Sequence, residues 1–180
     1  MNTIKLNNGV EMPIIGYGVF QVSPNEAERC VSDALSVGYR MVDTAQAYGN
    51  EEGVGEAIKK SGQDRHDIFL VDKIWIANYG YERAKASIDE SLRKLQTDCI
   101  DLMLLHQPYG DRYGAWRALE EAYKLGKVRA IGVSNFYPDH FIDFAHNNEI
   151  TPAVNQIETH VFQQQQISRK YMDELGIAHM

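Results

Sequence analysis

The sequence predicts an α/β fold in which parallel strands alternate with helices, and three observations support this. Short runs of aliphatic and β-branched residues recur along the chain with a spacing of roughly 25–30 residues. Segments with helical periodicity separate these runs. Helix boundary signals fall between them, such as Ser23-Pro24 before a helix and Gly38 after it. Strands connected in this way lie parallel, so their C-terminal ends share one rim of the sheet.

The expected strands follow in order, each short and bounded by Gly, Asp or Pro. The clearest are MVDTA at 41–45, IFLVDKI at 68–74 and IDLMLLH at 100–106, which have the composition of buried strands. Before them, TIKLNNGVEMPIIG alternates apolar and polar residues around Asn-Asn-Gly, which predicts an N-terminal β-hairpin. Counted along the chain, the repeated strands are expected to begin near Ile14, Met41, Ile68, Ile100, Val128 and Ala153.

Helices are expected between these strands. Glycines that suit the position just after a helix follow three of the segments, at Gly38, Gly126 and Gly176, and QQQQ at 163–166 is interpreted as a helix start. The expected helices cover residues 24–35, 51–60, 81–95, 113–125, 138–146 and 163–175. The last five residues, GIAHM, have the pattern of a seventh strand that is just beginning.

Repeated strand–helix units build either a (β/α)₈ TIM barrel or an open doubly wound sheet. GYGVF at 16–20 lacks the third glycine of a dinucleotide-binding turn, and polar residues end several successive strands, which favours the barrel. Such a barrel usually needs about 250 residues. We therefore expect residues 1–180 to form a single barrel domain that is incomplete, with about six units present and strands 7 and 8 missing. Its exposed edge strands would favour self-association.

Composition narrows the class of protein. A hydrophobic fraction of 44% and a charged fraction of 24% are ordinary for a globular domain. The net charge of −7, with no basic stripe, argues against a nucleic-acid partner. No apolar run approaches the roughly 20 residues of a membrane span, and no secretion signal is evident. Cys30 and Cys99 stand far apart, which favours a reducing, cytoplasmic location.

Four residues with acid–base chemistry are expected to meet at the C-terminal rim: Asp43, Tyr48, Lys73 and His106. A phenol with a pKa of about 10 is a poor acid at neutral pH, but a neighbouring cationic lysine would lower that pKa. Asp43 would keep the lysine charged, and His106 could donate a hydrogen bond to a carbonyl oxygen. Taken singly, Asp43 could cap a helix and Lys73 could extend its amine to solvent; together the four predict a proton-transfer site.

Other chemistries have less support. No serine lies in a nucleophile elbow and no cysteine ends a strand, which disfavours acyl transfer. The histidines and cysteines show no metal-ligand spacing, so we expect no metal site.

Two longer motifs resemble the signatures of the aldo-keto reductases. GYRMVDTAQAYGNEEGVG at 38–55 resembles the first signature and KVRAIGVSNF at 127–136 the second, while DKIW at 72–75 and LLHQP at 104–108 resemble the lysine and histidine strands. The similarity extends over the whole chain and is greatest to the bacterial diketogluconate reductase and prostaglandin F synthase type. Met41, Asp72 and the THVF segment at 159–162 depart from the usual pattern.

The resemblance implies an NADPH-dependent oxidoreductase that reduces aldehydes or ketones, which would be small-molecule substrates. By this analogy Tyr48 is the proton donor, Lys73 and Asp43 tune it, and His106 orients the carbonyl group. The implied cofactor-binding residues are Asp43, Ser134, Asn135 and Gln156, and the implied substrate-binding residues are Phe20, Trp75, His106 and Gln107. The alternative is a catalytically silent fragment that acts only as a structural or interaction unit.

Overall fold

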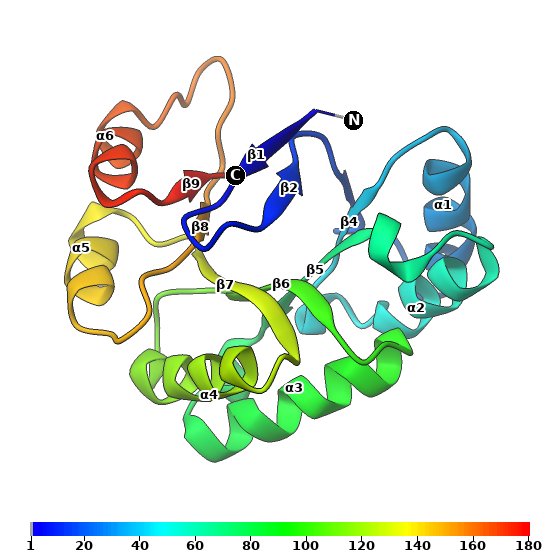
Figure 1. Ribbon diagram of the computed structural model, residues 1–180, viewed down its shortest axis with the longest axis horizontal. Coiled ribbons are helices and arrows are strands. Elements are labelled where there is room, and N and C mark those ends of the chain that lie inside the picture. Colours follow the sequence, from blue (N-terminus) through cyan, green and yellow to red (C-terminus); the bar gives the residue numbers. More distant parts are fainter. Residues whose placement is uncertain (1) are drawn as a thin grey trace.

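The computed structural model describes residues 2–180, and its main feature is a curled, seven-stranded parallel sheet. The strands follow one another in chain order, each hydrogen-bonded to the next. Figure 1 shows the sheet curving around the N-terminal hairpin, with the helices on its outer side. The strands of this sheet are β3 (Tyr17–Gly18), β4 (Met41–Asp43), β5 (Phe69–Ile74), β6 (Ile100–Leu105), β7 (Val128–Ser134), β8 (Val154–Gln156) and β9 (Ala178–His179).

One helix follows each of the first six strands, as the repeated pattern predicted. Their bounds are α1 (Pro24–Ser36), α2 (Glu51–Lys60), α3 (Tyr81–Leu95), α4 (Arg112–Lys124), α5 (Pro138–His146) and α6 (Gln166–Leu175). Three short 3₁₀ turns also occur, η1 (Gln46–Tyr48), η2 (Arg65–Asp67) and η3 (Ile76–Asn78). Among residues 2–180, no helix combines the length and apolar character that crossing a membrane requires.

Side chains alternate between two faces of every strand, and this creates two separate cores. On β5, Leu70 and Ile74 belong to the larger core beneath the helices, whereas Phe69 and Val71 belong to a smaller core inside the curl. The lysine at position 73 follows the inward register and the aspartate at position 72 follows the outward one. This alternation decides which polar side chains of β5 reach the interior.

The predicted hairpin forms from β1 (Thr3–Lys5) and β2 (Glu11–Pro13) and covers the N-terminal end of the interior. Leu6 and Met12 join the inner core. The amide of Asn7 donates to the carbonyl of Pro152 at 3.0 Å, and that of Asn8 donates to the carbonyl of Arg129 at 2.9 Å. The hairpin therefore closes one end of the curl and leaves the C-terminal rim for a site.

Two boundaries differ from the sequence prediction by three residues. The first sheet strand begins at Tyr17 rather than near Ile14, because only from Tyr17 does the chain pair with β4. The last helix begins at Gln166 rather than 163, because Gln163 bridges His160 in a tight turn. The start of a seventh strand, which GIAHM predicted, is confirmed by β9, whose residues pair with Val154 and Asn155.

The sheet is open between β3 and β9, which are not paired with each other within residues 2–180. A cavity of about 570 Å³ lies between these strands. Its lining includes the hairpin residues Ile4 and Met12, and also Asp43 and Gln156. The hollow inside the sheet therefore leads to residues that the sequence placed in the functional site.

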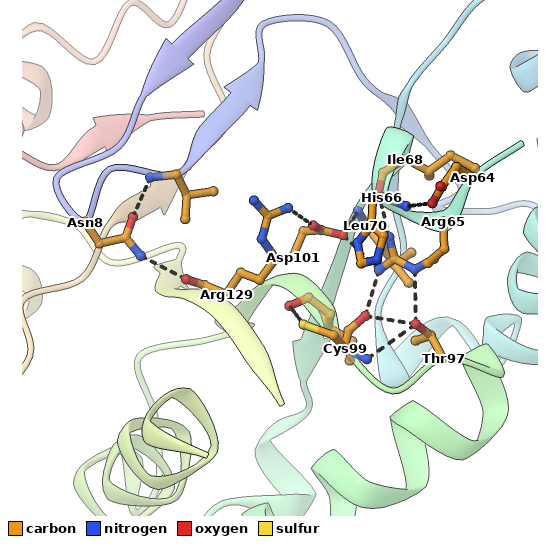
Figure 2. Close-up of polar contacts among 12 residues, drawn as sticks. Asn8, Asp64, Arg65, His66, Ile68, Leu70, Thr97, Cys99, Asp101 and Arg129 are labelled. Carbon is orange, nitrogen blue, oxygen red and sulfur yellow. Dashed lines mark hydrogen bonds and ion pairs between the residues drawn. The ribbon is translucent and has the colours of Figure 1, made fainter. Parts of the chain in front are cut away.

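A buried aspartate joins three strands at the N-terminal rim. Asp101, near the start of β6, has 2% of its surface exposed and is ion-paired with Arg65 at 2.8 Å and with Arg129 at 2.5 Å. The same carboxylate accepts the backbone N–H of Leu70 at 2.9 Å. Figure 2 shows how these contacts connect β5, β6 and β7 to the segment that precedes β5. Three polar groups thus depend on one side chain.

We expect Asp101→Asn to lower the free energy of unfolding by about 2–4 kcal/mol, because two arginines lose their counter-charge and one of the two acceptor oxygens becomes an amide donor. Urea unfolding at pH 7 would measure this change. Asp89→Asn is the matched control, since Asp89 pairs with Lys127 at the surface and should cost less than about 1 kcal/mol. Equal losses in the two variants would contradict the structural role given to Asp101.

Candidate active site

The structure brings Asp43, Tyr48 and Lys73 into contact inside the C-terminal rim. Lys73 lies on β5, has 2% of its surface exposed, and directs its amine into the curl. The amine Nζ donates to Asp43 Oδ1 and, at 2.9 Å, to the carbonyl of Thr44. It also lies 3.5 Å from the Tyr48 hydroxyl and 5.2 Å from the centre of that ring.

The sequence positions these groups by ending strands and beginning loops at the right places. Asp43 ends β4, and the following 3₁₀ turn η1 carries Tyr48 back over the rim. Lys73 comes one residue before the end of β5. A buried lysine needs a compensating charge, and the carboxylate of Asp43 supplies it. The ion pair therefore accounts for both buried charges and leaves the phenol as the group at the mouth of the site.

Burial raises the pKa of Tyr48 above its ordinary value. The positive charge of Lys73 lowers that pKa, but the desolvation of the phenol is the larger effect and Asp43 adds a further increase. The expectation that Lys73 brings the phenol below its usual pKa is therefore not met in this structure. Tyr48 is held as a protonated phenol at neutral pH, beside a cation that would stabilise its conjugate base.

His106 directly follows β6 and completes the cluster. Its ring lies edge-on to Tyr48, with centroids 5.7 Å apart, and edge-on to Trp75 at 5.2 Å. Burial and the charge of Lys73 lower the pKa of His106 to about 4. The ring atom Nδ1 is buried and has no hydrogen-bond partner among the described residues. His106 is thus a neutral imidazole at the mouth of the site.

The residues proposed for the cofactor lie on the next two strands, beside the ion pair. Ser134 ends β7, and the Asn135 amide donates to its hydroxyl at 3.1 Å and to the His106 carbonyl at 3.0 Å. Gln156 ends β8 and donates from Nε2 to Asp43 Oδ2 at 2.7 Å. Asp43 is therefore shared between Lys73 and Gln156, and all these residues occupy one continuous rim.

The residues proposed for the substrate differ in their surroundings. Phe20 is 66% exposed, with its ring 5.1 Å from that of Tyr48. Trp75 is half-buried beside His106. Gln107 is fixed through its backbone, which exchanges two hydrogen bonds with the hydroxyl of Tyr79. The apolar rings of Phe20 and Trp75 therefore flank the polar cluster at the open rim.

Sequence reasoning missed two residues that hold the rim loops in place. The Oε1 atom of Gln46 accepts hydrogen bonds from the Trp75 N–H at 3.0 Å and the Asn78 amide at 2.9 Å. Asn50 is buried and donates to the carbonyls of Val19 and Val22, both at 3.0 Å. Both lie within a few residues of Tyr48, in the first motif, but their partners lie in other loops, so no local pattern reveals them.

Comparison with known proteins finds relatives that are named as a reductase and a dehydrogenase. It is 49% identical over 178 residues to the glyoxal reductase of Bacillus subtilis, covering 98% of this chain and 64% of the relative. It is 46% identical over 162 residues to the morphine 6-dehydrogenase of Pseudomonas putida, covering 88% of this chain and 55% of that protein. The chain thus spans less than two thirds of the length of these relatives.

Solved structures agree with this result. An aldo/keto reductase from Brucella melitensis superposes with a TM-score of 0.96 at 45% identity, over 99% of this chain and 71% of the other. An aldo-keto reductase from Bombyx mori, solved in complex with NADP, gives a TM-score of 0.94 at 33% identity, over 99% and 65% of the two chains. The model of the aldo/keto reductase family matches residues 14–180. With its rim of Asp43, Tyr48, Lys73 and His106 on that fold, the chain belongs to the aldo/keto reductase family.

Proposed function

We propose that this chain carries the active site of an NADPH-dependent reductase that converts small aldehydes or ketones to alcohols. The observation that carries the proposal is the position of the Lys73 amine between the Asp43 carboxylate and the Tyr48 phenol. The names of the relatives support the reaction class, and the NADP in the silkworm structure supports the cofactor. The reducing cytosol, where both cysteines would remain as the free thiols seen here, is the proposed location.

The side chains at the ends of β7 and β8 fit the nicotinamide end of such a cofactor. A carboxamide offers both a donor and an acceptor, and Ser134, Asn135 and Gln156 offer hydroxyl and amide groups of both kinds. Asp43 holds the amide of Gln156, and the His106 carbonyl holds the amide of Asn135. These contacts fix the orientation of the binding groups in advance. NADPH, when bound, supplies the hydride to the carbonyl carbon.

Tyr48 is the proposed proton donor. As the carbonyl oxygen gains negative charge, the phenol O–H bond breaks and its proton passes to that oxygen, forming the O–H bond of the alcohol. The phenolate that remains lies beside the Lys73 amine, 3.5 Å away, so its charge develops next to a fixed cation. Lys73 in turn stays charged because Asp43 is bound to it. The raised pKa of Tyr48 keeps the proton in place until the acceptor oxygen becomes basic.

His106 is the proposed positioning group for the carbonyl oxygen. A neutral imidazole carries one N–H and can donate one hydrogen bond without bringing a second acid into the site. Its ring packs edge-on against that of Tyr48, with centroids 5.7 Å apart, so the two donor side chains lie together at the rim. Phe20 and Trp75 then provide apolar walls for the rest of the substrate.

We expect Tyr48→Phe to lower kcat for aldehyde reduction by about 10²-fold to 10⁴-fold, because the variant has no proton to donate. The loss of NADPH absorbance with glyoxal as the substrate would measure this. Tyr123→Phe is the matched control, since it removes a phenol hydroxyl from α4 on the outer layer and should leave the rate unchanged. Retained activity in Tyr48→Phe would remove Tyr48 from its proposed role. Absence of turnover in the unaltered chain would favour the silent-fragment alternative.

We expect the His106 imidazole to remain neutral down to about pH 5, because its pKa is lowered to about 4. Nitrogen NMR of the ring between pH 8 and 5 would show the signals of one neutral tautomer. Because this pKa lies below that of a histidine in the unfolded chain, the contribution of His106 to stability is complete above about pH 6.5. It is lost as the pH falls through 4. If the His106 ring instead titrated near pH 6.5, the proposal that it acts as a neutral hydrogen-bond donor would be contradicted.

A further inference from the structure

Asp72 lies immediately before Lys73. Among residues 2–180, it is a fully buried carboxyl group for which no ion pair is found. Its exposed fraction is 0%, and neither carboxylate oxygen has a hydrogen-bond partner of normal geometry among residues 2–180. The strand alternation that points Lys73 into the curl points Asp72 the other way, into the layer between β5 and the helices. No step of the proposed reaction uses this carboxyl group.

A second buried carboxylate faces the same layer. Glu51 begins α2 and has 1% of its surface exposed. It already has two donors, because Ser91 Oγ on α3 donates to its Oε1 at 2.8 Å and Lys94 Nζ donates to its Oε2 at 3.0 Å. The charged and titratable groups around Asp72 are Lys73 on its own strand, Tyr48 from η1 and Glu51 from α2, to which Lys94 from α3 is bound. Its neighbour on β6, Met103, is apolar.

These charges do not balance if both carboxyl groups are ionised. Lys94 is bound to Glu51 and Lys73 is bound to Asp43, so no cation is left for Asp72. A buried carboxylate without a counter-charge is strongly disfavoured, and a protonated carboxylic acid avoids that penalty. Because Glu51 holds both nearby donors, Asp72 is the member of the pair that keeps the proton.

We propose, on the basis of the function proposed above, that Asp72 is a positioning residue which carries a proton in the active protein and ionises as the pH rises. In that role Asp72 titrates on the outer face of β5, opposite the face from which Lys73 contacts Tyr48. Burial and the negative charge of Glu51 raise the pKa of Asp72 to about 7. His106 and Tyr48 titrate far from this value, so Asp72 is the group of these three that changes charge between pH 6 and 8.

Ionised Asp72 would act on the site in two ways. Its negative charge raises the pKa of Tyr48, which opposes Lys73 and makes the phenol a weaker acid. It would also compete with Glu51 for the Ser91 hydroxyl. Ser91 accepts a hydrogen bond at 3.1 Å from Gln46, which lies in the same turn as Tyr48 and also holds the Trp75 N–H. As the pH rises, Tyr48 therefore becomes a weaker proton donor and the hydrogen bonds that hold its turn are weakened.

The first test measures stability and does not depend on catalysis. Because the pKa of Asp72 is higher in the folded state, its stabilising contribution is complete below about pH 4 and is lost as the pH rises through 7. Asp72→Asn, which is neutral and has nearly the same shape, should therefore raise Tm, and by more at pH 8 than at pH 5.5. Asp101→Asn is the matched control, because it removes an equally buried but ion-paired carboxylate and should lower Tm at both pH values.

A second measurement on the unaltered protein makes the test independent of how the variant folds. Infrared spectra at pH 5.5 should contain a carboxylic-acid C=O band that disappears by pH 8.5 and is absent from Asp72→Asn. Failure of Asp72→Asn to fold, or a fall in its Tm at pH 8 like that of Asp101→Asn, would overturn the proposal. Absence of the infrared band would do the same.

The catalytic part is tested by the pH profile. We expect kcat for glyoxal reduction to fall about threefold to tenfold from pH 6 to 8 in the unaltered protein and to stay flat in Asp72→Asn. Equal slopes in the two proteins would overturn the positioning role, even if the stability test shows the proton. Absence of turnover in either protein would instead count against the proposed function, while the stability and infrared results still decide where the proton lies.

Discussion

The buried ion pair between Lys73 and Asp43 is the interaction on which the geometry of the site depends. Lys73 is a cation in the interior of the sheet. Without Asp43, its amine would contact only the neutral Thr44 carbonyl and the Tyr48 hydroxyl. Asp43 in turn anchors Gln156 from the far side of the sheet. One carboxylate therefore joins β4, β5 and β8 and fixes the position of the amine beside Tyr48. The same constraint explains why the sheet must curl, since β4 and β8 are not neighbours in it.

The two rims of the sheet use buried charge for different purposes. At the N-terminal rim, Asp101 satisfies two arginines and a backbone N–H, so its charge is fully compensated and holds strands together. At the C-terminal rim, the charges are arranged next to groups that can exchange protons. A hairpin covers the first rim. The loops at the second rim carry exposed aromatic rings, such as those of Phe20 and Tyr109. The division between stability and chemistry thus follows the strand direction, as it does in barrels generally.

Much of this arrangement follows from local sequence signals, and the rest does not. The apolar runs located β4 to β7 because buried parallel strands are nearly continuous in aliphatic residues. Helices α2, α3 and α5 have the bounds that their patterns predicted. The start of α6 was misplaced, because a bridge between His160 and Gln163 depends on a turn that composition does not specify. The direction of the pKa shift of Tyr48 could not be predicted from the sequence either. It depends on how much surface the phenol loses on folding as well as on its nearest cation.

The alternation of a strand gives adjacent residues separate tasks, and β5 shows how closely these can be coupled. Lys73 and Asp72 are bonded through one peptide unit, yet one side chain enters the curl and the other enters the helix layer. A charge placed on the outer side is separated from the phenol by protein rather than by water, so it is weakly screened. The residue before the lysine is therefore well placed to tune the site without contacting the substrate. Sequence reasoning noted Asp72 only as a departure from the usual motif, because its significance depends on Glu51 and Ser91, which α2 and α3 bring to the outer face of the strand.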